Sequence, residues 1–188
     1  PFDPKGYKLV LLNSLVKHEL ASSAYNDRRK SCENVVAVMK KHWPEVETLR
    51  DATYDMLDEV RDEISEEDAL RAKYVIGEKY RVLEVCVALE EGDYEEVGKK
   101  MYETHRGLSK EYEVSCPELD FLNDVAHSCG VTGSRIMGGG FGGCTINLVS
   151  EDLYANFIET AKKAYKEKYG KEPIVIDVVI GDGARKLC

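Results

Sequence analysis

The hydrophobic and polar positions of this chain follow two different periods. Short apolar runs typical of strands occupy residues 7–12, both sides of residues 138–143, and residues 174–180. Longer stretches carry apolar residues at the i, i+3, i+4, i+7 spacing of a helix buried on one side, as at Cys32, Val35, Val36 and Met39. The pattern therefore predicts the order strand, several helices, strand, strand, helix, strand.

Capping residues divide the helical part into separate helices. Three pairs have the spacing of helix starts: Ser65 with Asp68, Asp93 with Glu96, and Ser115 with Glu118. We also expect one helix from Ser22 or Ser23 to about Pro44, a short one near 54–60, and one over 152–169. Glycines at 92, 130 and 170 are expected to end three helices. The inner face predicted for the long helix after Ser65 consists of Ala72, Val75, Val82, Val85, Cys86 and Leu89.

This order predicts an α+β fold with one antiparallel four-stranded sheet. We expect the helices to pack on one face of that sheet. The 188 residues are enough for one domain, over 1–188, and contain no internal repeat or low-complexity linker.

Charge and composition narrow the classes of partner. The chain has 26 basic and 35 acidic residues and a net charge of −9, which argues against nucleic acid or an anionic membrane as a partner. No apolar run approaches the roughly 20 residues that span a bilayer, and the start shows no signal-peptide pattern. The six cysteines form no Cys-x-x-Cys pair, so we expect no zinc site. Reduced thiols in a cytoplasmic protein are the better interpretation.

The glycine-rich run SRIMGGGFGGC (Ser134–Cys144) is the most informative segment. It fits an ordinary glycine-rich hairpin or bulge. The spacing of Gly138, Gly140 and Gly143 also matches a dinucleotide-binding fingerprint, but a β-branched, strand-like segment follows instead of a helix. The other elements of a protein kinase are absent from the sequence. What remains is a strand, a glycine turn and a strand, whose amides could line an anionic or tightly packed ligand.

At these residues the chain resembles the GHMP small-molecule kinases. The glycine run is similar to the third motif of that family, and two further blocks narrow the resemblance to its galactokinase branch. These blocks are HELASSAYNDRR (His18–Arg29), and HRGLS (His105–Ser109) with YEVSCPELD (Tyr112–Asp120). Similarity continues through RAKYV (Arg71–Val75) and ALEEGDY (Ala88–Tyr94), so it covers nearly the whole chain.

The resemblance implies the fold of a GHMP kinase C-terminal domain, which is ferredoxin-like. It also implies that the parent protein transfers the γ-phosphoryl group of ATP to the anomeric hydroxyl of galactose. In such kinases ATP and magnesium are bound mainly by an N-terminal domain, which also carries the catalytic Asp. The chain begins at Pro1 and shows none of those upstream motifs. We therefore expect a carboxy-terminal fragment with no catalytic residue or metal ligand of its own, inactive alone, whose partner is its own N-terminal domain.

Two other functions remain open. The parent could be a galactose and ATP sensor that has lost catalysis, because such proteins keep most kinase motifs. It could also phosphorylate N-acetylgalactosamine, because sugar specificity rests largely on the absent part.

The resemblance assigns a substrate-binding role to one side chain and an active-site role to one loop. Tyr25 matches the tyrosine that contacts the sugar. The active-site loop comprises Gly138, Gly139, Gly140, Phe141, Gly142 and Gly143, and its expected role is to permit close backbone approach. Met137 stands where relatives often carry Thr. We also predict an exposed apolar or glycine-lined face around this turn, which could drive dimers of the isolated chain.

Several other residues have simpler interpretations. Arg28 and Arg29 share the helical face of Tyr25, where we expect them mainly to pair with acidic neighbours at the surface. Asp182 lies in an ordinary Gly-Asp-Gly turn. His18 and His105 are expected to be structural, and Cys144 to be a packed strand residue.

Overall fold

This computed structural model describes residues 4–17, 21–181 and 183, and for residues 21–23 it describes the backbone alone. The order of the elements is the predicted one. The strands are β1 (Tyr7–Asn13), β2 (Gly133–Met137), β3 (Cys144–Ser150) and β4 (Ile174–Asp177). The helices are α1 (Ala21–His42), α2 (Tyr54–Glu59), α3 (Glu66–Glu91), α4 (Tyr94–Lys110), α5 (Pro117–Ser128) and α6 (Glu151–Tyr169), with a 3₁₀ turn at Arg61–Glu63.

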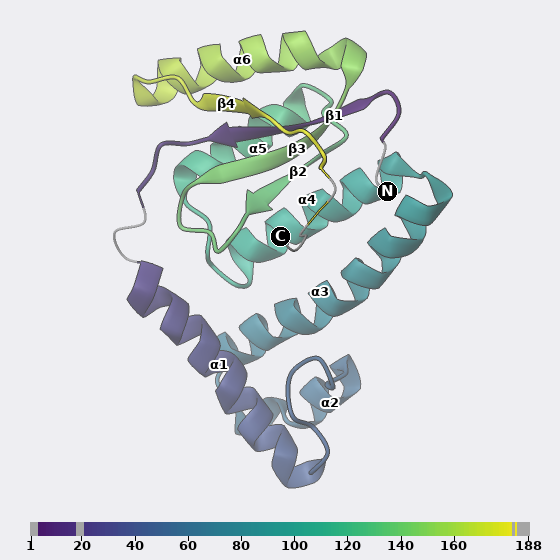
Figure 1. Cartoon of the computed structure of the whole chain (residues 1–188). Coiled ribbons are helices and arrows are strands. Elements are labelled where there is room, and N and C mark those ends of the chain that lie inside the picture. Colours follow the sequence, from purple (N-terminus) through teal and green to yellow (C-terminus); the bar gives the residue numbers. More distant parts are fainter. Residues whose placement is uncertain (1–3, 18–20, 182, 184–188) are drawn as a thin grey trace, which may run out of the picture.

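The four strands form one antiparallel sheet in the order β2-β3-β1-β4 (Figure 1). This confirms the predicted fold class. The register pairs Leu11 of β1 with Ile146 of β3 and with Ile176 of β4. The strand predicted for 174–180 ends early, at Asp177, although Val178 still donates its backbone N–H to the Leu9 carbonyl at 3.1 Å.

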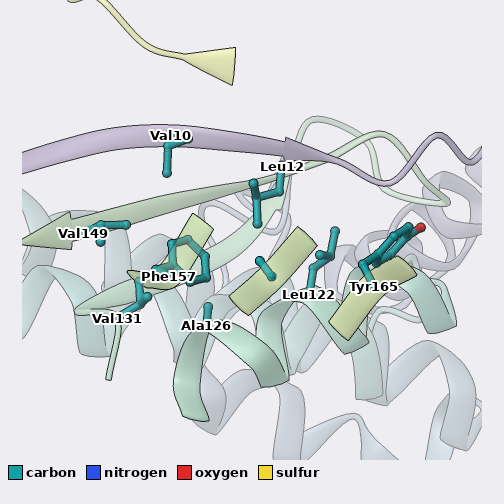
Figure 2. Close-up of a cluster of buried hydrophobic side chains, with 9 residues drawn as sticks. Val10, Leu12, Leu122, Ala126, Val131, Val149, Phe157 and Tyr165 are labelled. Atoms are coloured by element: carbon teal, nitrogen blue, oxygen red, sulfur yellow. The ribbon is translucent and has the colours of Figure 1, made fainter. Parts of the chain in front are cut away.

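Helices cover both faces of the sheet, so the expectation of one covered face is wrong. On one face Val10, Leu12 and Val149 pack against α5 and α6 in the core drawn in Figure 2. On the other face Leu9 and Leu148 pack against the facing parts of α3 and α4. The pattern of an amphipathic helix shows that one side is buried, but it does not say against which face of a sheet.

A second hydrophobic core lies away from the sheet. The helices α1, α2 and the first half of α3 form an arm that projects from the sheet layers (Figure 1). The fully buried centre of this arm includes Val35, Met39, Val60, Ala72 and Ile76. Because α3 runs from the arm to the sheet, this helix joins the two cores.

The structure confirms two of the three predicted N-terminal caps. The Ser65 hydroxyl accepts a hydrogen bond from the Asp68 N–H at 3.1 Å, and the Asp93 carboxylate accepts one from the Glu96 N–H at 3.0 Å. The cap predicted at Ser115 is wrong, because α5 begins at Pro117, whose fixed φ suits the first helical position. The helix α1 begins at Ala21, ahead of both serines that we expected to cap it.

Candidate functional site

The glycine turn, residues 138–143, connects the edge strand β2 to the central strand β3. It also contacts the segment after β1 and the α4–α5 loop. Cross-strand pairing ends at Met137 and Cys144, so the turn begins directly beyond the ladder. The backbone N–H and the side-chain hydroxyl of Ser14 both donate to the Gly143 carbonyl at 2.8 Å. The end of β1 therefore holds one side of the turn in place.

The turn has a packed side and an open side. A Cβ at Gly140 would lie 2.1 Å from the Val114 carbonyl oxygen, and one at Gly142 would lie 2.8 Å from the Val16 carbonyl oxygen. In contrast, a Cβ at Gly138 or Gly139 would meet no atom within 4 Å. The expected close backbone approach thus occurs within this chain at Gly140 and Gly142. At Gly138 and Gly139 the turn has free space in front of it for another group.

Residues with left-handed backbone conformation occur in the glycine turn and in the two segments that contact it. In the described part of the chain, the non-glycine residues with positive φ are Leu15 at 61°, Glu113 at 54° and Phe141 at 60°. They lie in the three segments that meet at the turn, and the Phe141 N–H donates to the Val114 carbonyl at 2.5 Å. Such conformations are costly for residues with a Cβ and are often found at functional sites.

Tyr25 lies on α1, close to the α4–α5 loop that packs against the glycine turn. Its side chain is 60% exposed, which leaves the phenol accessible to a ligand. Tyr25 is also close to Tyr112, in the α4–α5 loop beside Glu113. Burial raises the pKa of the Tyr112 phenol, and the neighbouring Cys32 and Tyr25 side chains raise it further. The predicted substrate residue and the predicted loop are therefore on the same side of the molecule.

Arg28 connects these elements. Its guanidinium donates to the Tyr112 carbonyl at 2.9 Å and to the Glu113 carbonyl at 2.6 Å, and it lies 5.7 Å from the centre of the Phe141 ring. Its side chain is only 13% exposed. The adjacent Arg29 points the other way, is 69% exposed, and pairs with Glu33 on its own helix. The expected pairing with an acidic neighbour at the surface is thus confirmed for Arg29. Arg28 also has an acidic neighbour, since its guanidinium lies 3.9 Å from the Glu113 carboxylate, but its side chain is largely buried and bonds mainly to backbone carbonyls.

A polar network centred on Asp120 connects α4, the α4–α5 loop and α5. The His105 Nε2 atom lies 3.2 Å from the Asp120 carboxylate, which also accepts hydrogen bonds from Ser109 and Ser115. Burial opposes ionisation of Asp120, but the hydrogen bonds from His105, Ser115 and Ser109 outweigh it and hold its pKa below the ordinary value. The structural role expected for His105 is confirmed.

The remaining candidates add no chemistry to this site. His18 and Asp182 lie outside the described residues. Burial raises the pKa of the Cys144 thiol, which favours the unreactive protonated form. Over residues 4–17, 21–181 and 183, no group of three or more His, Cys, Asp or Glu side chains is placed to hold a metal ion. Among the helices in that same part of the chain, none is long and apolar enough to cross a membrane.

Sequence reasoning missed the backbone groups that shape the site. Carbonyl oxygens of Val16 and Val114 pack against the turn, and those of Tyr112 and Glu113 accept hydrogen bonds from Arg28. No residue type marks a carbonyl as important. One signal was available, because the block Tyr112–Asp120 stood out by resemblance although no function was assigned to it.

Comparison with known proteins gives a match to one family model. The family model described as "GHMP kinases C terminal" matches residues 86–167. Residues 86–167 therefore match a GHMP kinase C-terminal domain, and the antiparallel sheet has the topology expected for it.

Galactokinases are among the proteins to which the chain is similar. The chain is 42% identical to the human galactokinase, over 99% of this chain and 45% of the relative. It is also 42% identical to the galactokinase of Clostridium beijerinckii, over 97% and 47%. The solved structure of Lactococcus lactis galactokinase complexed with galactose matches with a TM-score of 0.91 at 29% identity, covering 100% of this chain and 48% of that one. The chain thus spans about half the length of the relatives that it matches.

Proposed function

We propose that this chain is the carboxy-terminal domain of an ATP-dependent sugar kinase that converts galactose to galactose 1-phosphate. One observation carries the proposal: Arg28, three residues after Tyr25 on α1, contacts both the α4–α5 loop and the Phe141 ring of the glycine turn, 113 residues away in sequence. The names of the galactokinase relatives supply the substrate and the reaction.

The domain contributes binding surface to the reaction. Tyr25 places its ring against the sugar and its hydroxyl within hydrogen-bonding distance of a sugar hydroxyl, since an exposed tyrosine offers both an apolar face and a polar tip. Gly138 and Gly139 leave room for a ligand or a neighbouring loop to approach the backbone closely. Positioning of this kind accounts for much of the rate enhancement in phosphoryl transfer.

ATP and magnesium would be bound mainly by an N-terminal domain of the same polypeptide. When bound, they supply the phosphoryl group and neutralise its charge. The described part of this chain offers no metal-ligand set, so we assign no magnesium ligand here. We place the protein in the cytoplasm, because the cysteines of the described part are free thiols.

An uncovered apolar part of the sheet supports the presence of a further domain. Met137 and Ile174 are both exposed. Met137 pairs with Cys144, Cys144 with Asn13, and Asn13 with Ile174, and directly paired residues lie on the same face of a sheet. The exposed Ile176 is on the same face, which α3 and α4 cover only in part. A domain of the parent protein packed there would remove this apolar surface from water.

The test is ADP release coupled to a spectroscopic assay. The full-length parent protein should phosphorylate galactose, and the 188-residue chain alone should not. A parent that binds galactose without turnover would instead be a sensor. A parent that prefers N-acetylgalactosamine would have a different sugar specificity. Turnover by the isolated chain would contradict the assignment of nucleotide binding and catalysis to another domain.

A further inference from the structure

We propose that Arg28 is a positioning residue that holds Tyr25 beside the glycine turn for sugar binding. The inference rests on the proposed function, since it assigns to Arg28 a role in the same site. Arg28 is not expected to touch the sugar itself. Its effect on the reaction would pass through Tyr25, one helical turn earlier on α1.

Among the described side chains, Arg28 attaches the first turns of α1 to the α4–α5 loop. Ala24 is half-buried, and Tyr25, Asn26 and Asp27 are exposed. The packed core of the arm begins later on the helix, with Cys32 and Val35. Between these regions, the Arg28 guanidinium forms hydrogen bonds that reach from α1 to the α4–α5 loop. Loss of these bonds would free the exposed turn that carries Tyr25 from the α4–α5 loop.

The contacts of Arg28 join parts of the site that are far apart in sequence. It donates to two successive carbonyls, at Tyr112 and Glu113, and its plane lies near the Phe141 ring. Both Glu113 and Phe141 have left-handed backbone. The planar guanidinium therefore stabilises the two unusual loop conformations together and sets Tyr25 relative to both. A planar fork that binds two acceptors and stacks on a ring is a property of Arg that Lys does not share.

The neighbouring arginine supplies a matched control. Arg29 has the same charge and lies on the same helix, but its guanidinium bonds Glu33 one turn later. Replacing Arg29 removes an equal charge without touching either loop. A difference between the two arginines is therefore due to the contacts of Arg28 and not to its charge.

The experiment measures kcat and both KM values of the full-length parent protein, together with its thermal midpoint. Arg28→Ala should raise the KM for galactose about tenfold or more, because misplacement by about 1 Å can cost 100-fold. The KM for ATP should change by less than about twofold, because the proposed effect is confined to the sugar site. A mere loss of folded enzyme would instead lower kcat and leave both KM values unchanged. Arg28→Lys should recover only part of the loss, and Arg29→Ala should match the parent.

A double-variant cycle separates positioning from general stability. If Arg28 acts through Tyr25, then Arg28→Ala should have little further effect on the KM for galactose in a Tyr25→Ala background, which lacks both the ring and the hydroxyl. Should Arg28→Ala fail to fold, the same cycle with Arg28→Lys replaces it. Independent, additive effects would overturn the inference, as would a lower kcat with both KM values unchanged.

The two proposals fail in different ways. Active parent protein in which Arg28→Ala behaves like Arg29→Ala would overturn the role of Arg28 and leave the kinase assignment intact. Parent protein that neither binds galactose in calorimetry nor phosphorylates it would overturn both.

Discussion

The carbonyl oxygen of Val114 occupies the space that a side chain at Gly140 would need. A Cβ at Gly140 would lie 2.1 Å from that oxygen, far inside van der Waals contact. The same carbonyl accepts a hydrogen bond from the Phe141 N–H, so the contact also fixes the turn. The α4–α5 loop and the glycine turn are therefore a single packed unit.

Replacing Gly140 should disrupt this unit. Gly140→Ala adds a Cβ against backbone and also requires a left-handed conformation at φ +82°, so we expect a loss of roughly 3 kcal/mol in the free energy of unfolding. Gly139→Ala is the control, because its Cβ would meet open space, and it should change stability by less than about 0.5 kcal/mol. Urea unfolding measures both, and equal stabilities would contradict the packing described.

Tyr25 is the substrate contact that this domain is proposed to provide. Tyr25→Phe keeps the ring and removes the hydroxyl, so the KM for galactose of the parent protein should rise about fivefold, the equivalent of one hydrogen bond. Tyr80→Phe is the control, since Tyr80 stacks on Tyr54 in the helical arm. A KM for galactose unaffected by Tyr25→Phe would remove Tyr25 from the sugar site.

Asp120 should make stability depend on acid pH. Its pKa is depressed in the folded protein, so its ionised form contributes stability above the unfolded pKa of about 4. That contribution is lost progressively as the pH falls below about 4 and the carboxylate takes up a proton. We expect Asp120→Asn to be less stable at pH 7 and to lose less stability than the original chain below pH 4. Asp124→Asn, at an exposed position on the same helix, should preserve the original pH profile in unfolding experiments.

The core between the sheet and α6 should depend on Phe157. This ring is fully buried in the cluster drawn in Figure 2, so Phe157→Ala should cost about 3–5 kcal/mol through lost burial and an unfilled cavity. Val179→Ala, at a position that is 89% exposed, should cost less than about 0.5 kcal/mol. The measurement is again urea unfolding at neutral pH.

The uncovered face of the sheet should make the isolated chain self-associate. Ile174 and Ile176 lie on β4, an edge strand, and unprotected apolar edges promote pairing between chains. Ile176→Lys should shift the chain toward the monomer in sedimentation velocity experiments, while Val87→Lys, on α3, tests whether any added charge has the same effect. A chain that is monomeric at high concentration would contradict the prediction.

Local features were set by the sequence itself. The caps at Ser65 and Asp93 and the helix ends at Gly92 and Gly170 follow from hydrogen bonds and φ preferences within four residues, so short segments determine them. The same holds for the order of strands and helices. The glycine run and the Tyr25 block also carry the family resemblance in the sequence alone.

Long-range packing decided the rest. Val82 was predicted to face inward, yet its side chain is 54% exposed, because α3 buries Ala72 and Ile76 against the arm and Ala88 against the sheet layers. A single helical stripe does not describe a helix that changes partners along its length. Arg28 and Arg29 likewise look equivalent in sequence, and only the position of the α4–α5 loop, 84 residues away, makes one buried and the other solvated. Sequence determined the local conformations, whereas tertiary packing determined which side chains those conformations bring together.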